Sequence, residues 1–150
     1  MDLDELIKST HLNLNRQGKG LLFLVISDLE RRNDLMKKLS ESSIPSYHLQ
    51  SSYDDPATCA RDFLDQCVQL SGMPGVVYTV EDIVKELQER SPNGRREFWQ
   101  AMNFYCDLYA EQATKNTGLL ITKDTQQLLL QRFPDIYSRK VSVQDFSKYW

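Results

Sequence analysis

The chain has 150 residues, of which 41% are hydrophobic and 26% charged, and its formal net charge is −3. This size and composition suit one globular domain with its own core. The charge disfavours binding to nucleic acid or to an anionic membrane. No apolar run approaches the roughly 20 residues that cross a bilayer, and the acidic start at residues 1–5 is unlike a secretory signal, so we expect a cytoplasmic protein.

The first part of the chain predicts one helix, a loop and a buried strand. Apolar residues at helical spacing favour a short amphipathic helix from residue 2 to about residue 10, and the polar stretch from Asn13 to Gly20 predicts a loop. Residues 21–26 form an unbroken apolar run, which is typical of a central strand covered on both faces. Asp28 stands where it could cap a following helix with apolar residues up to Leu39.

The same alternation continues through the rest of the chain. Residues 46–50 predict a weak peripheral strand, residues 75–80 and 117–122 two buried strands, and residues 140–146 an edge strand. Helices are expected after Asp54 or Asp55 with Pro56, over residues 80–90, over about residues 95–114, and from a cap at Asp124 to a break at Pro134. A turn-rich loop is expected between the second and third of these helices, at residues 91–94.

Strands that alternate with helices require crossover connections, and these favour parallel pairing. We therefore predict an α/β fold, with a doubly wound, mostly parallel sheet of about five strands and helices on both faces. The domain is expected to consist of an N-terminal helix and loop at residues 1–19 and a sheet core at residues 20–146.

Acidic residues follow several of the strands, where ligands bind in open parallel sheets. Asp28, Glu81, Asp82 and Asp124 could together form a site that handles a nucleotide or a phosphate. However, the turn after the first strand has no glycine and carries carboxylates where phosphates would lie, so the usual phosphate-binding loop is missing. The alternative is that these acids cap helices or occupy their first turns.

The cysteines and histidines indicate no metal site and no cofactor. Three cysteines, at positions 59, 67 and 106, form no C-x-x-C pair, which argues against structural zinc and against a disulfide framework. We expect them to be small buried residues. A nucleophilic pair of His48 with a cysteine stays open, although no flanking motif supports it.

The long helix carries more aromatic residues than one core-facing stripe can use. An excess of this kind indicates either a deeply central helix or a contact surface. Arginine and aromatic residues are enriched at interface hot spots. We therefore predict a partner-binding surface made of Arg95, Arg96, Trp99, Phe104 and Tyr105.

The second half of the chain, about residues 75–146, resembles a segment of bacterial signalling ATPases of the STAND class. Asn103 matches an asparagine of the long helix, and Pro134, Asp135, Tyr137 and Arg139 match a terminal motif. Cys106 stands where the family usually has an arginine. Because the first half lacks the nucleotide-binding loop, the resemblance implies a degenerate P-loop-like domain that retained the scaffold and its contact surfaces.

The leading hypothesis is a non-catalytic recognition or adaptor domain with a protein partner, which the resemblance places in a bacterial signalling or defence system. The rival is an enzyme that handles nucleotides or phosphate through the four acids. A third reading, nucleic-acid binding through Arg95-Arg96 and Arg139-Lys140, is disfavoured by the net charge.

Overall fold

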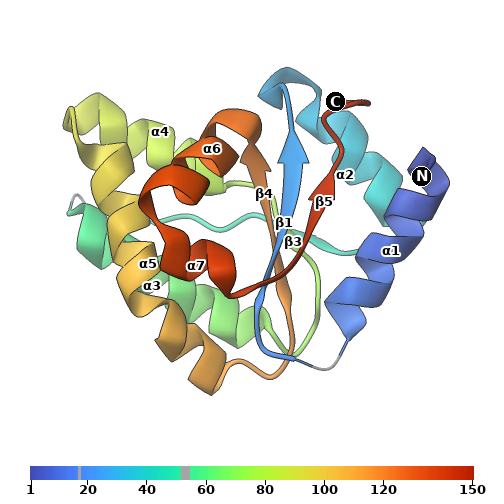
Figure 1. The fold of residues 1–150 in the computed structure, drawn as a ribbon, viewed down its shortest axis with the longest axis horizontal. Helices are drawn as coiled ribbons and strands as arrows, with labels where there is room; N and C mark the ends of the chain where they lie inside the picture. The colour runs from blue at the N-terminus through green and yellow to red at the C-terminus, as the bar shows by residue number, and fades with distance from the viewer. Residues whose placement is uncertain (17, 52–54) are drawn as a thin grey trace.

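The computed structural model describes residues 1–16, 18–51 and 55–150 (Figure 1). The elements follow one another in this order: α1 (Leu3–Asn15), β1 (Leu21–Ile26), a 3-10 turn η1 (Leu29–Arg31), α2 (Arg32–Glu41), β2 (Ser46–Tyr47), α3 (Pro56–Leu70), β3 (Val76–Val77), α4 (Val80–Arg90), α5 (Gly94–Gln112), β4 (Thr117–Thr122), α6 (Lys123–Arg132), α7 (Pro134–Ser138) and β5 (Lys140–Asp145).

The five strands form one sheet in the order β2-β3-β4-β1-β5, and every neighbouring pair is parallel. This confirms the predicted doubly wound α/β fold. The three apolar runs become the adjacent strands β3, β4 and β1, with Leu21 opposite Thr117 at the start of the β1–β4 pair. The two weaker segments, β2 and β5, are the edge strands, as their sequences predict.

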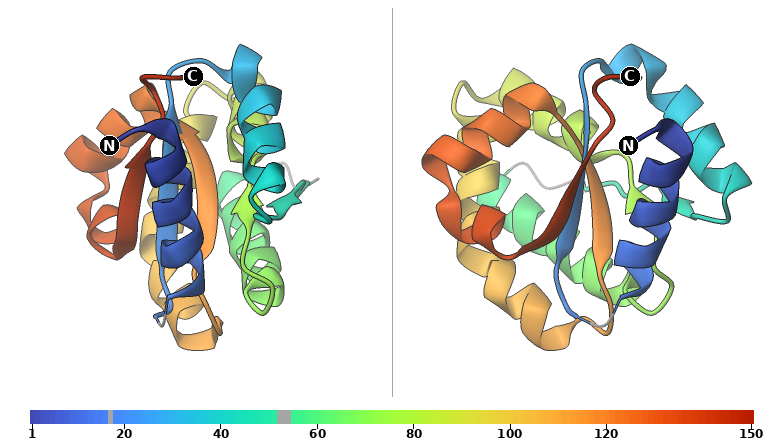
Figure 2. Two further views of the ribbon diagram at one scale, coloured as in Figure 1. Left: turned by 90° about the vertical axis from the view of Figure 1, so that its right-hand side faces the viewer. Right: turned by 45° about the vertical axis from the view of Figure 1, so that its right-hand side comes forward.

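Helices cover both faces of the sheet (Figures 1 and 2). On one face, Phe23, Val25 and Ile121 pack with buried residues of α3 to α7. On the other face, Leu22 and Leu24 pack with buried residues of α1 and α2. Because consecutive strand residues point to opposite faces, the continuous apolar run of β1 supplies both cores, and all six of its residues are buried.

Helix α1 is longer than the sequence predicts. It begins after Asp2, whose carboxylate accepts a hydrogen bond from the Glu5 amide at 2.8 Å, and it continues to Asn15 where a loop was expected. Leu14 lies two turns after Ile7 on the buried side, which extends the apolar stripe. The buried Asn116 side chain donates to the Asn13 carbonyl at 2.8 Å and accepts from the Gly20 amide at 3.0 Å, so it joins α1 to the sheet.

Helices α4 and α5 meet through a tighter connection than the sequence suggests. The expected loop at residues 91–94 shrinks to three residues, since Gly94 is already the first residue of α5. A Cβ atom at Gly94 would overlap the backbone of Leu87, with the Leu87 carbonyl carbon only 2.6 Å away. Glycine therefore allows the start of α5 to press directly against α4.

Side-chain caps agree with the sequence at two of three places. Asp28 accepts from the Glu30 amide at 2.9 Å, and Asp55 accepts from the Thr58 amide at 2.9 Å ahead of Pro56; the other candidate, Asp54, lies outside the described residues. The prediction that Asp124 caps α6 is wrong. Thr122 is the N-cap, because its extended backbone ends β4 and its hydroxyl accepts from the Thr125 amide at 3.3 Å.

The three cysteines are unpaired and buried, as predicted. Within the part of the chain that the structure describes, no helix is both long enough and apolar enough to cross a membrane.

Candidate functional site

The edge of the sheet where β1 and β4 end is the first candidate site. After β1 the chain enters α2 on one face, whereas after β4 it enters α6 on the other face. Such a divergence between neighbouring strands is the topological switch point, where open parallel sheets bind their ligands. A cavity of about 670 Å³ lies there, and Glu81, Asp82 and Asp124 are among its lining residues.

The turn after β1 has little room for a phosphate, because its amide groups already have acceptors. The Ser27 and Asp28 amides both donate to the carbonyl oxygen of Trp150, at 2.9 and 3.0 Å. The Ser27 hydroxyl donates to the Ser147 carbonyl at 3.0 Å. The C-terminal residues of this chain thus occupy the donors that a phosphate-binding loop would direct at its ligand.

Glu81 joins α4 to the end of β4. Its carboxylate accepts hydrogen bonds from the Thr122 hydroxyl at 2.7 Å, from the Thr122 amide at 3.3 Å, and from the Thr125 hydroxyl at 2.8 Å. Thr125 is fully buried. A carboxylate with this many protein donors is held in place by them, which makes Glu81 a link between elements.

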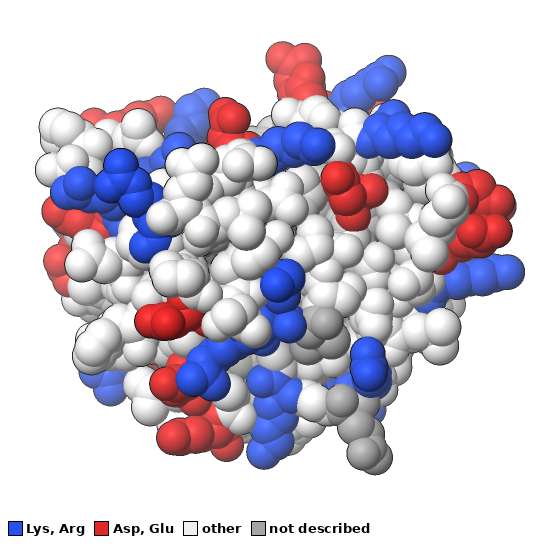
Figure 3. All heavy atoms as spheres, viewed as in Figure 1, with Lys and Arg blue, Asp and Glu red and all other residues white. Residues whose placement is uncertain are grey.

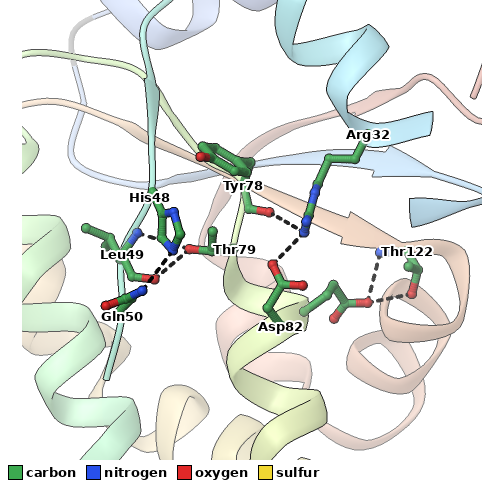
Figure 4. Close-up of polar contacts among 9 residues, drawn as sticks. Arg32, His48, Leu49, Gln50, Tyr78, Thr79, Asp82 and Thr122 are labelled. Carbon is green, nitrogen blue, oxygen red and sulfur yellow. Dashed lines mark hydrogen bonds and ion pairs between the residues drawn. The ribbon is translucent and has the colours of Figure 1, made fainter. Parts of the chain in front are cut away.

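Asp82 pairs with a basic residue of another helix, α2. Arg32, at the start of α2, reaches Asp82 at 2.5 Å and also donates to the Tyr78 carbonyl at 3.1 Å (Figure 4). The guanidinium carbon lies 5.6 Å from the centre of the Tyr78 ring. Beside this pair, the Thr79 hydroxyl donates to the Leu49 carbonyl at 2.8 Å. This bond holds the loop that follows β2 in place.

The four predicted acids are therefore not arranged as one reactive cluster. Asp28 caps η1, Glu81 binds two threonines, Asp82 pairs with Arg32, and Asp124 is exposed in the first turn of α6. Among the described residues, no group of three or more His, Cys, Asp and Glu side chains is placed to hold a metal ion.

The outer side of α5 is the second candidate site. The inner side of this helix packs on the sheet through several fully buried aromatic and apolar residues, and Trp99 is one of them, with no exposed surface. The expectation that Trp99 contacts a partner is corrected, because its indole is enclosed between Phe98, 5.3 Å away between ring centroids, and the rest of the core.

The two predicted arginines point to different environments. Arg95 is half-buried and donates to the Thr125 hydroxyl at 3.2 Å, and it lines the crevice at the strand ends. Arg96 is exposed. Arg95 therefore belongs to the same neighbourhood as Glu81, whereas Phe104 and Tyr105 line a different pocket.

Phe104 and Tyr105 lie on the outer side of α5. Phe104 is 77% exposed in the middle of the helix. Tyr105 is half-buried, and its ring meets the Phe104 ring edge-on at 5.0 Å between centroids. The Arg61 guanidinium of α3 lies over the Tyr105 ring, 5.7 Å from the ring centre.

Phe104 and Tyr105 line an open groove of about 830 Å³, which we call the α5 groove. It extends from the first turn of α3 across α5 to α7, and its charged lining residues are Asp55, Glu97, Asp107, Asp135 and Arg139. Hydrogen bonds from Thr58 hold the pKa of Asp55 below its usual range, so its carboxyl is ionised at neutral pH. Burial raises the pKa of the Cys106 thiol in the same groove, which keeps it protonated and weakly nucleophilic.

Two contacts close one side of the α5 groove, and the sequence singled out Asn103, Asp135 and Arg139 without indicating their partners. The Asn103 side chain accepts from the Ile136 amide at 2.7 Å and donates to Asp135 at 3.3 Å. Arg139 pairs with Asp107 at 2.7 Å. The spacing of Asn103 and Asp107, one turn apart on the same helix face, is the signal that could have indicated a shared neighbour.

Comparison of the chain with family models, with curated proteins and with solved structures finds no match in any of the three.

Proposed function

We propose that this protein is a non-catalytic recognition or adaptor domain that binds a protein partner through the outer side of α5. The observation that carries the proposal is the exposure of Phe104, at 77%, beside the α5 groove. Burying a phenylalanine side chain is worth about 1.5–3 kcal/mol. The other aromatic residues of α5 are buried or half-buried, so Phe104 is available for a partner.

The crevice at the strand ends supports the same proposal by offering little for catalysis. Two of its acids are engaged, Glu81 with Thr122 and Thr125 and Asp82 with Arg32, and the amides after β1 bind the Trp150 carbonyl. Figure 3 shows acidic and basic side chains of the described residues on the same face, where several basic ones gather at the lower centre beside acidic ones without forming one broad basic area. A nucleic-acid backbone would require such an area.

The proposed setting is a bacterial signalling or defence system, in which this domain is a degenerate P-loop-like module. The basis is the resemblance over residues 75–146 to STAND-class ATPases. The residues that carry it contact one another, since Asn103 binds the start of α7 at Asp135 and Ile136. On this view the domain retains the scaffold of such ATPases and serves as a contact module.

The proposal is tested by placing a benzophenone amino acid at position 104 in cells that express the chain and irradiating them. We expect one adduct of defined mass, which excess unmodified chain competes away. The matched control carries the same group at Leu12, which is 70% exposed on α1. Identical adducts from both positions, or none from position 104, would contradict a partner surface on α5.

The rival function, nucleotide or phosphate handling by the acids, has its own test in thermal unfolding with ATP or GTP and Mg²⁺. A ligand at 100 times its Kd stabilises a protein by about 2.7 kcal/mol. We expect no shift of the midpoint, because the donors after β1 are occupied. A concentration-dependent shift that Glu81→Gln removes would favour the enzyme.

A further inference from the structure

We infer that the α5 groove recognises a basic peptide segment, one in which lysines or arginines flank an apolar side chain that packs on Phe104. This inference rests on the proposed function and specifies the chemistry of the partner. It follows from the charge of the groove, from the apolar residues in its lining and from the ion pair that its own basic group makes.

The charge of the α5 groove is mainly negative. Four carboxylates and one guanidinium are among its described lining residues. The guanidinium, that of Arg139, already pairs with Asp107 at 2.7 Å. Glu97 is exposed and makes no ion pair with any described residue, and Asp55 is ionised. The groove therefore presents carboxylates that a cationic partner can neutralise, whereas an acidic partner would be repelled.

Apart from Arg139, two further basic groups on α3 and α5 lie outside the groove lining. Arg61 stands over Tyr105 on the α3 side, and Arg96 is exposed near the start of α5. Arg61 already has a partner, since its guanidinium lies over the Tyr105 ring at 5.7 Å from the ring centre. Asp55, Glu97 and Asp135 are the carboxylates of the groove lining that make no ion pair with a described residue.

Two lining residues of the groove suit the apolar parts of a basic segment. Phe104 and the exposed Ala57 offer aromatic and small apolar surface in the same groove as the carboxylates. The methylene stems of lysine and arginine lie along such surface while their charged ends reach acids. A guanidinium or ammonium can also stack on the exposed Phe104 ring.

The probes are three fluorescent synthetic peptides of 18 residues, each an amphipathic helix with leucines and one phenylalanine on the apolar side. Their polar sides carry lysine and arginine, glutamine, or glutamate. Fluorescence anisotropy measures binding to the full chain and to four variants. Phe104→Ala is matched by Leu12→Ala, and Glu97→Lys is matched by Glu111→Lys, which makes the same charge change on α5 outside the groove lining.

We expect saturable binding of the basic peptide, weaker binding of the glutamine peptide and none of the glutamate peptide. Phe104→Ala and Glu97→Lys should each weaken binding by about 10- to 30-fold, as at interface hot spots, while Leu12→Ala and Glu111→Lys change it by less than about twofold. Binding should also weaken as salt is raised to about 1 M, where screening is nearly complete.

Failure of the basic peptide to bind, or an equal loss with Glu97→Lys and Glu111→Lys, overturns the inference. If the glutamine peptide binds as tightly as the basic one and Phe104→Ala weakens both, α5 is a docking surface whose partner is not selected by charge. That outcome overturns the partner chemistry and leaves the proposed function standing. Circular dichroism of each variant shows whether it keeps the fold.

Discussion

Glu81 shows how much the role of a single residue depends on its surroundings. A carboxylate directly after a buried strand could be a metal ligand or a general base. Here it accepts from two threonine hydroxyls and one amide, at 2.7, 2.8 and 3.3 Å, and two of these donors belong to Thr122 at the end of β4. Its carboxylate oxygens therefore have a structural role in holding elements of the fold together.

Glu81→Gln should therefore destabilise the protein. The glutamine side chain replaces a charged acceptor with a neutral one. Its NH₂ group also brings two donors to a place where the threonine hydroxyls already donate. We therefore expect the free energy of unfolding to fall by about 1–2 kcal/mol. Urea unfolding followed by circular dichroism measures it. Glu89→Gln, at an exposed position of the same helix, is the control and should change stability by less than about 0.5 kcal/mol. If Glu81→Gln instead stabilises the protein, the native carboxylate is unfavourable for folding, which is typical of a residue kept for function.

At the scale of elements, α7 depends on a neighbour for its start. It has only five residues, and its N-cap residue Phe133 makes no side-chain capping bond. Asn103 of α5 supplies the missing acceptor, since its side-chain oxygen binds the Ile136 amide at 2.7 Å. A helix this short is unstable alone, so its place against the α5 groove depends on this contact.

Asn103→Ala should loosen α7 selectively. Loss of the cap is expected to lower the free energy of unfolding by about 1–2 kcal/mol and to speed hydrogen exchange of the Ile136 amide, measured by NMR. Asp107→Asn removes an exposed pair with Arg139 instead, and it should cost less than about 1 kcal/mol. Unchanged protection of the Ile136 amide in Asn103→Ala would show that packing alone holds α7.

The sequence was a good guide to strands and a weaker guide to helix ends and surfaces. An unbroken apolar run such as residues 21–26 has one stable placement, in the middle of a covered sheet. A cap depends on local backbone geometry, which is why Thr122 takes the place expected for Asp124. Aromatic residues lie on all sides of α5, so their spacing does not indicate which side of the helix faces the sheet. For this reason the sequence could not distinguish the buried Trp99 from the exposed Phe104.

The sequence predicted where a site could lie, but not which residues would form it. The sequence suggested both the carboxyl edge of the sheet and the aromatic helix. It could not show that Arg95 turns toward Thr125, nor that Asn103 and Arg139 contact partners more than 30 residues away in the chain. Such pairings depend on how α5 and α7 pack, which no local pattern encodes.

At the scale of the whole molecule, helices cover both faces of the sheet, so we expect the domain to unfold cooperatively. Cys59 and Cys67 of α3 have no exposed surface, whereas Cys106 of α5 is 5% exposed. Burial also raises the pKa of the Cys67 thiol. These thiols should react only when the chain opens, and Cys67 only when α3 leaves the sheet.

Thiol alkylation with mass spectrometry at increasing urea tests this cooperativity. We expect Cys106 to react first and Cys59 and Cys67 to react together, at least about a thousandfold more slowly than in the unfolded chain, because domains of this size are stable by about 5 kcal/mol or more. The logarithm of their rate should rise with urea in step with global unfolding. Rapid, urea-independent labelling of Cys67 would reveal a local opening of α3.

The position of β1 between β4 and β5 has a consequence for synthesis. Residues 21–26 pair with residues 117–122 and 140–145, so the most apolar strand is made first and its partners far later. At about 5–20 residues per second, a ribosome needs on the order of ten seconds to deliver β4. During that interval β1 is a nascent strand with two unsatisfied edges, the kind of segment that chaperones shield. Expression of this protein should therefore respond to chaperone supply more strongly than its native stability suggests.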